Sequence, residues 1–231
     1  MPFSRRIEAV IIDLDGTLAD TAPDLAEAAN RMLRDLDLPA RSLVEVTSFI
    51  GKGIPNLVAR CAGDAYAADS VKLEAALTRF EAHYRDVCGQ FAVLFPGVRE
   101  GLADFHAQGL RCACMTNKAT QFTEPLLATL GLSDYFELVV SGDTLAKKKP
   151  DPMPLSYVCE RFDVAPAAAL AIGDSPNDTQ AARAAGCPMV CVPYGYREGL
   201  DVRELDCDAI VSTLAEAASL IRNENARRQA A

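Results

Sequence analysis

The chain has 231 residues, which is enough for one large domain or for a core with a smaller lobe. Half of the residues are hydrophobic and the formal net charge is −9. This charge argues against nucleic acid or an anionic membrane as the main partner, because both attract basic surfaces. No apolar run in the sequence approaches the length of a membrane span. Eight cysteines without a C-x-x-C pair indicate reduced thiols, so we expect a cytoplasmic protein.

The N-terminal part of the chain begins with an apolar run at residues 8–12, which predicts a buried strand. From residue 21 to about residue 90 the apolar residues recur at helical spacing and no convincing strand is found. We expect helices near residues 23–36 and 42–50, around residues 57–61, and over residues 71–87, with a break at Gly63-Asp64. This stretch therefore predicts a small helical lobe.

The remaining chain alternates between predicted strands and helices. Strands are expected at residues 110–115, 136–140, 168–172 and 189–192, with a short one at 209–211. Such alternation predicts an α/β fold with a doubly wound parallel sheet. The helical lobe interrupts the series after the first strand, so we expect an α/β core of residues 1–20 and 91–231 with an inserted all-helical cap of residues 21–90. The last few residues, including Arg227 and Arg228, are expected to form a frayed tail.

Two aspartates, Asp13 and Asp15, follow the first predicted strand with one residue between them. Residues i and i+2 of an extended strand point the same way, so both carboxylates can face one small volume. Two carboxylates held together repel each other unless a metal, a lysine or a shared proton offsets the charge. A divalent metal bound by oxygen ligands fits best. The alternative is a polar strand end with an Asx turn.

Three further polar clusters follow later strands. They are Thr116-Asn117-Lys118, Lys147-Lys148-Lys149-Pro150 and the stretch from Gly173 to Asp178. Each alone is a weak signal, since the first can cap a helix, the second can be a solvated surface and the third can be a turn. Ligands of doubly wound sheets bind beyond the carboxyl ends of the strands. Four clusters at this one edge therefore predict a single site.

The chemistry that needs this set of residues is phosphoryl transfer to a carboxylate. Asp13 would attack phosphorus, and Asp15, on the same face, would protonate the leaving alkoxide and later deprotonate the attacking water. Thr116, the amide of Asn117 and a lysine would hold the transferring oxygens.

Asp174 would complete a Mg²⁺ site with Asp13 and the backbone carbonyl of Asp15. Asp178 would orient the lysine or a water bound to the metal.

The order Asp13-x-Asp15-Gly16-Thr17, Thr116-Asn117, Lys149-Pro150 and Gly173-Asp174-Ser175-x-Asn177-Asp178 resembles the haloacid dehalogenase superfamily over nearly the whole chain. The resemblance implies that Asp13 is the nucleophile and a metal ligand, that Asp15 is the general acid and base, and that Asp174 binds Mg²⁺. The dehalogenases of the superfamily lack the second aspartate, so Asp15 favours a phosphatase. The helical insertion resembles the cap of one subgroup.

The resemblance also assigns phosphate binding to Thr116 and to a lysine before a proline, for which Lys149 is the first choice and Lys148 the second. Asn177 and Asp178 are supporting residues on this reading. Further stretches, among them Phe95-Pro96-Gly97-Val98, resemble members of the superfamily that hydrolyse 2-phosphoglycolate. Another sugar phosphate, pyrophosphate or a phosphomutase reaction remains an alternative.

Within the lobe, Gly51 and Lys52 are candidate substrate-binding residues, because Lys52 lies between glycines that let the backbone approach a ligand. The alternative is a simple turn between helices. Two readings from other classes fit less well. A signalling receiver domain is much shorter and carries its acceptor aspartate after the third strand, and a binding protein with a relic site would not need every catalytic position filled. We expect a small phosphorylated substrate and a monomer or homodimer.

Overall fold

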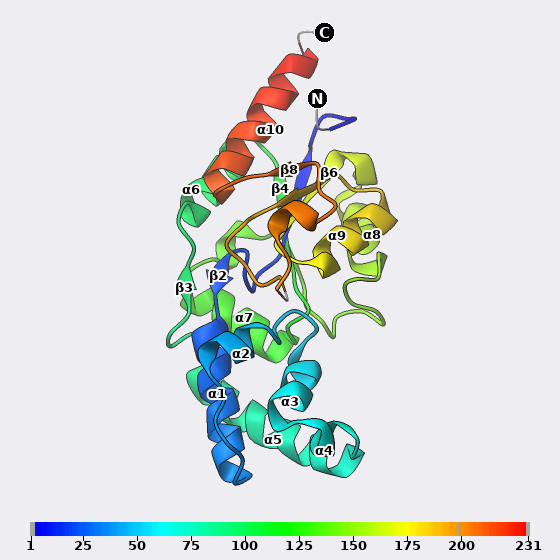
Figure 1. Ribbon diagram of the computed structural model, residues 1–231. Helices are drawn as coiled ribbons and strands as arrows, with labels where there is room; N and C mark the ends of the chain where they lie inside the picture. The colour runs from blue at the N-terminus through cyan, green and yellow to red at the C-terminus, as the bar shows by residue number, and fades with distance from the viewer. Residues whose placement is uncertain (1–2, 198, 230–231) are drawn as a thin grey trace.

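The computed structural model describes residues 3–197 and 199–229. A six-stranded sheet with helices on both sides forms one part of the molecule, and helices α1–α5 form the other (Figure 1). The strands of the large sheet are β1 (Ala9–Ile12), β4 (Arg111–Met115), β5 (Leu138–Val140), β6 (Ala169–Gly173), β7 (Met189–Cys191) and β8 (Ala209–Ile210). All lie within the six predicted strand regions or one residue beyond them, so these predictions are confirmed.

The large sheet has the order β5-β4-β1-β6-β7-β8 and every neighbouring pair is parallel. The predicted doubly wound α/β fold is thus confirmed. β1 lies between β4 and β6, and its residues Val10 and Ile12 pack into a different apolar cluster from Ala9 and Ile11. This alternation follows from the two-residue period of a strand whose two faces are both buried.

Helices cover both faces of the sheet. The cluster around Val10 and Ile12 includes Phe105 of α6, Leu126 of α7 and Ile221 of α10. The cluster on the other face includes residues of α8 and α9. The bounds of these helices are α6 Val98–Ala107, α7 Thr120–Thr129, α8 Met153–Phe162, α9 Pro176–Ala185 and α10 Leu214–Gln229, with short 3-10 turns at Ser133–Tyr135, Pro166–Ala168 and Val202–Glu204.

The helical lobe has an apolar cluster of its own. Its helices are α1 (Ala22–Asp35), α2 (Leu43–Thr47), α3 (Ile54–Ala62), α4 (Asp64–Ala67) and α5 (Ser70–Val87). Buried Leu33, Val58, Phe80 and Tyr84 pack together in it. The one-turn helix α4 stands where the sequence predicts only a break, because Gly63 takes a left-handed backbone (φ 89°) and the chain then turns once more before α5.

The two segments that join the lobe to the rest of the chain run side by side. β2 (Ala19–Asp20) and β3 (Val93–Leu94) form a two-stranded antiparallel sheet. The sequence did not predict it, because two-residue strands leave no periodic pattern.

The C-terminal residues contradict the predicted frayed tail. α10 continues to Gln229, and Arg227 forms an ion pair of 2.9 Å with Glu224. Arg228 donates to the carbonyl oxygens of Phe3 and Ser4 at the other end of the chain. The contact with Phe3 and Ser4 orders the chain as far as Gln229, and such a long-range contact has no local sequence signal. For residues 230 and 231 the prediction falls outside the described residues. Across residues 3–197 and 199–229, no helix combines the length and apolarity that crossing a bilayer needs.

Candidate active site

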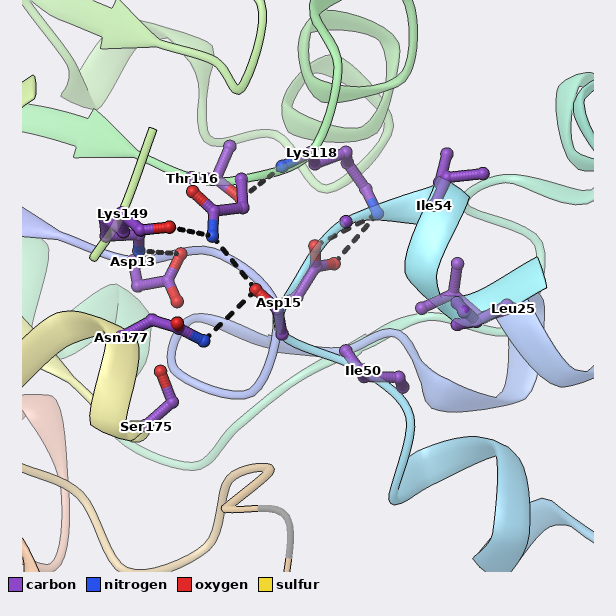
Figure 2. A pocket seen from close by; sticks show the side chains of 14 residues that line it. Asp13, Asp15, Leu25, Ile50, Ile54, Thr116, Lys118, Lys149, Ser175 and Asn177 are labelled. Atoms are coloured by element: carbon purple, nitrogen blue, oxygen red, sulfur yellow. Dashed lines mark hydrogen bonds and ion pairs between the residues drawn. The ribbon is translucent and has the colours of Figure 1, made fainter. Parts of the chain in front are cut away.

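The polar clusters of the sequence meet at the carboxyl edge of the large sheet. Because β1 lies between β4 and β6, the segments that follow these three strands are neighbours. A cavity opens there with room for only a few water molecules, about 40 Å³ (Figure 2). Its core side is lined by Asp13, Asp15, Thr116, Asn117, Lys118, Lys149, Ser175 and Asn177, and its lobe side by Leu25, Ile50, Gly51, Gly53, Ile54 and Leu57.

Asp13 is fixed in a buried position directly after β1. Its Oδ1 accepts the backbone N–H of Leu14 at 2.7 Å and lies 2.9 Å from Nζ of Lys149. Burial raises the pKa of Asp13 to about 7, although the charge of Lys149 opposes this shift. Within the described residues, Oδ2 accepts no hydrogen bond, so one oxygen is held and the other is available for reaction.

Lys149 is the cation behind Asp13. Its buried Nζ also contacts Oδ1 of Asp178 at 2.6 Å and donates to the carbonyl of Met115 at 3.0 Å. Burial alone would lower the pKa of Lys149, but the charges of Asp13 and Asp178 raise it above its ordinary value, so the ammonium stays charged. Lys148 points elsewhere, with its Nζ 3.1 Å from the carbonyl oxygen of Lys52.

Three buried carboxylates could hold a metal ion. Oxygens of Asp13, Asp174 and Asp178 lie within 4.8 Å of one another. Asp174 accepts the Thr17 hydroxyl at 2.6 Å and the Tyr196 N–H at 2.5 Å. Burial raises the pKa of Asp174 well above its ordinary range, and the charges of Asp178 and Asp13 add to the rise. Three carboxylates around one lysine leave negative charge uncompensated, so the donor set fits a hard divalent cation.

The carboxylate of Asp15 lies apart from this metal-type cluster. Its Oδ1 accepts the hydroxyl of Thr21 at 2.6 Å, and Nζ of Lys118 contacts its two oxygens at 3.0 and 3.1 Å. Thr21 is the N-cap residue of α1, so the position of Asp15 is tied to the first helix of the lobe. The predicted metal contact through the backbone carbonyl of Asp15 stays a prediction.

Thr116 and Asn117 follow β4 and reach the same cavity. The Thr116 hydroxyl accepts the backbone N–H of Lys118 at 3.2 Å. The side-chain amide of Asn117 donates to the carbonyls of Gly51 at 3.0 Å and Lys149 at 2.9 Å. The side chain of Asn177 also reaches the Gly51 carbonyl, at 3.4 Å. These amides tie the Gly51 loop of the lobe to the core.

The structure does not bring every candidate to the cavity that contains Asp13. Gly51 lines it, whereas the exposed Lys52 lines a neighbouring cavity together with Lys148 and Gln180. No role was predicted for Lys118, Ser175 or the apolar side chains of the lobe. For Lys118 a signal was present, since it directly follows Thr116-Asn117 at a strand end; the apolar residues look like any other helix core.

Known proteins match the chain over nearly its full length. A phosphoglycolate phosphatase of Thiobacillus denitrificans is 55% identical, with 95% of this chain and 97% of that protein covered. A phosphoglycolate phosphatase of Nitrosospira multiformis is also 55% identical, with coverage of 97% and 100%. The crystal structure of a predicted phosphoglycolate phosphatase from Haemophilus somnus 129pt superposes with a TM-score of 0.89 at 32% identity, covering 94% of this chain and 99% of that one.

The family model for the haloacid dehalogenase-like hydrolases matches residues 10–192, a span that includes Asp13, Thr116, Lys149 and Asp174. The family expectation drawn from the four motifs is therefore confirmed, and the chain belongs to the haloacid dehalogenase-like hydrolases.

Proposed function

We propose that the protein is a Mg²⁺-dependent phosphatase that hydrolyses 2-phosphoglycolate to glycolate and phosphate through a phosphoaspartate on Asp13. The observation that carries the chemistry is the Asp13 carboxylate, held at Oδ1 by Leu14 and Lys149 in a cavity that Asp15 and Thr116 also line. The substrate follows from the relatives that are 55% identical and are named phosphoglycolate phosphatases.

In the first step, an oxygen of Asp13 forms a bond to phosphorus while the bond from phosphorus to the ester oxygen breaks. The leaving oxygen takes the proton of the Asp15 carboxyl group, so glycolate departs with its hydroxyl restored. Hydrogen bonds from Lys149 and Leu14 hold Asp13 ready for attack, which removes part of the entropic cost of the step.

In the second step, a water molecule attacks the phosphorus of the phosphoaspartate. Asp15, now ionised, takes a proton from this water, the bond between Asp13 and phosphorus breaks, and inorganic phosphate leaves. Both carboxyl groups then return to their starting state. Asp15 thus serves as acid in one step and as base in the other.

The transferring phosphoryl oxygens need positive charge and fixed donors around them. Lys149, the hydroxyl of Thr116 and the backbone N–H of Asn117 are proposed for this role. Within the described residues, the N–H of Asn117 makes no backbone hydrogen bond, so it is available to a ligand. Asp178 positions Lys149 through its contact of 2.6 Å, and Asn177 steadies the loop at Gly51.

Asp13 and Asp174 would hold Mg²⁺, with the backbone of Asp15 as a further ligand. The ion, when bound, offsets the negative charge of the phosphoryl group and of the carboxylates. The raised pKa values of Asp13 and Asp174 support this assignment, because burial, and after it the neighbouring carboxylates, disfavour the ionised forms that a bound cation would stabilise.

We further propose that residues 21–90 act as a cap over a core of residues 1–20 and 91–231, with the paired strands β2 and β3 as the hinge region. The cavity supports this, because its walls come from both the lobe and the core, so a movement of the lobe away from the core would widen it for the substrate. A cytoplasmic location and a monomeric or homodimeric state belong to the same proposal.

The test is release of phosphate from 2-phosphoglycolate compared with a panel of sugar phosphates and pyrophosphate, with and without Mg²⁺. A kcat/KM for phosphoglycolate at least about 100-fold above the panel, lost with EDTA, is the expected result. Broad and weak release would overturn the substrate but keep the reaction. Isomerised phosphorylated products without release of phosphate would favour a phosphomutase.

A further inference from the structure

Lys118 is a buried cation in the cavity wall that the proposed chemistry does not use. Only 2% of its side chain is exposed, as for Lys149. Lys149 is engaged by Asp13, Asp178 and a backbone carbonyl, whereas Nζ of Lys118 is paired with Asp15 and lies 5.0 Å from the centre of the Tyr84 ring. Burying an ammonium group is costly, so its place in the wall calls for an anion beside it.

The position of Lys118 separates the two ends of the cavity. Figure 2 shows Asp13 and Lys149 together on one side of Asp15, and Lys118 on the other side, toward Ile54 and Leu25 of the lobe. The phosphoryl group must lie beside Asp13. Because Asp15 gives its proton to the leaving oxygen, the leaving group extends past Asp15 into the region that Lys118 borders.

The surroundings of Lys118 restrict what can occupy this region. The lobe side of the cavity is formed by the apolar side chains of Leu25, Ile50, Ile54 and Leu57, and the space is small. Asp13 and Asp15 repel a further anion everywhere except near a cation. A short leaving group with one negative charge therefore fits, and the buried ammonium of Lys118 can pair with its charge at that end.

We propose that Lys118 binds the carboxylate of the leaving group and thereby selects 2-phosphoglycolate over phosphomonoesters with a neutral leaving group. The inference rests on the proposed function. In the free enzyme Asp15 occupies the place of this carboxylate on Lys118. When the substrate carboxylate takes Lys118 as its partner, Asp15 is released from the bidentate contact and takes a proton from solvent water, which it then gives to the leaving oxygen.

We expect a phosphomonoester with a neutral leaving group to be a poorer substrate at this site. Lys118 then keeps Asp15 as its partner, and the apolar walls give a hydroxyl group nothing in exchange for its lost water. The neutral ester therefore reacts slowly because Asp15 stays engaged by Lys118, and it binds weakly because its hydroxyl group finds no partner at the apolar walls.

The test compares 2-phosphoglycolate with 2-hydroxyethyl phosphate, in which a neutral hydroxymethyl group replaces the carboxylate. The ratio of the two kcat/KM values is measured for the wild type, Lys118→Met and Lys118→Gln, with Lys72→Met on the exposed side of α5 as the control. We expect the ratio to fall at least about 100-fold in Lys118→Met, through a loss confined mainly to phosphoglycolate. Lys72→Met keeps the wild-type ratio.

Lys118→Gln retains a neutral donor for Asp15, so it guards against a loss that comes only from disturbing that carboxylate or the fold. Thermal unfolding of each variant confirms that it is folded. We expect the ratio in Lys118→Gln to fall as in Lys118→Met, because an amide carries no charge for the carboxylate.

An unchanged ratio in the Lys118 variants would overturn the inference alone: an equal loss for both substrates would mean that Lys118 acts only through Asp15, and no loss for either would mean that Lys118 has no part in the reaction. A collapse of the ratio in Lys52→Met instead would place the carboxylate at the neighbouring cavity and would also overturn it. A wild type that hydrolyses phosphomonoesters without preferring phosphoglycolate would reject the substrate assignment itself, and the role of Lys118 with it.

Discussion

The two sides of the cavity are built in different ways. On the core side, Asp13 directly follows β1 and Lys149 lies in the segment between β5 and α8; both are charged and are held by hydrogen bonds of 2.6–3.0 Å. On the lobe side, Ile54 and Leu57 belong to α3 and Ile50 lies just before it. These residues contribute apolar surface to the cavity. Lys118 lies between the two sides: its backbone belongs to the core, and its side chain extends toward the lobe.

The difference teaches that the reaction and the choice of substrate are separated in this molecule. A parallel sheet brings the ends of distant strands to one edge, which positions charged groups rigidly for one chemistry. The lobe presents a surface whose shape depends on side-chain packing and can vary without disturbing that edge. Substitutions of Asp13 or Lys149 should therefore affect all substrates, and those on the lobe side or at Lys118 should alter the differences between substrates.

The largest expected effect comes from Asp13→Asn. Loss of the nucleophile should reduce kcat for every phosphomonoester by about 10⁴-fold or more, because the covalent route is lost. Steady-state phosphate release measures this. The control is Asp134→Asn, at an exposed position of the α/β part of the chain. If the variant hydrolysed even one substrate at the wild-type rate, Asp13 would not be the nucleophile for all substrates.

Lys149→Met should follow with a loss of about 10²–10³-fold in kcat/KM for all substrates. The variant also leaves the buried carboxylates of Asp13 and Asp178 without their cation, so the free energy of unfolding should fall by about 3–5 kcal/mol. Urea denaturation and kinetics measure the two effects. Lys148→Met tests the alternative phosphate-binding lysine. A larger loss of kcat/KM in Lys148→Met than in Lys149→Met would assign phosphate binding to Lys148.

The charge of the core side also predicts a pH dependence. Burial raises the pKa of Asp13 from 3.8 to about 7, so in the metal-free protein its stabilising contribution is present below about pH 4 and is lost as the pH rises through 7. Metal binding requires the ionised carboxylate. The increase in Tm on adding Mg²⁺ should therefore be larger at pH 8 than at pH 5, as calorimetry can measure.

In Asp13→Asn this group no longer titrates, so the growth of the Mg²⁺ effect with pH should become smaller, and Asp174, whose pKa is also raised, supplies what remains of it. The same increase in Tm at both pH values in the wild type would contradict the account of Asp13.

The smallest effect is expected on the lobe side. Ile54→Ala removes apolar surface from the cavity, so kcat/KM for phosphoglycolate should fall by about 10-fold while bulkier leaving groups gain relative to it. Val44→Ala, at a position of the lobe that is 80% exposed, serves as the control. A uniform loss across the panel would mean that the lobe side does not discriminate between substrates.

The same division explains what the sequence could predict. The strands and the acids after β1 and β6 were readable, because an apolar run that ends in Asp13 or Asp174 is a local pattern, and the topology rule then places both at one edge. The position of Lys149 behind Asp13 also agrees with its place before a proline in the family motif.

The remaining features depend on contacts between distant segments. The sequence shows Lys118 only as a polar residue after a strand, and its ion pair with Asp15 is visible only in the structure. Thr21, at the start of α1, donates its hydroxyl to the same carboxylate. Ile54 and Leu57 have the spacing of core residues, and nothing local distinguishes a cavity wall from a helix core. The pairing of β2 with β3 likewise involves segments more than 70 residues apart.

The most direct test of the account is chemical trapping of the phosphorylated residue. Enzyme quenched in acid during turnover of phosphoglycolate is treated with borohydride, which reduces an acyl phosphate to the alcohol, and is then analysed by peptide mass spectrometry. We predict homoserine in place of Asp13 and nowhere else. Homoserine at another aspartate, or unmodified Asp13 in enzyme that shows a burst of glycolate release, would contradict the claim that Asp13 carries the phosphoryl group.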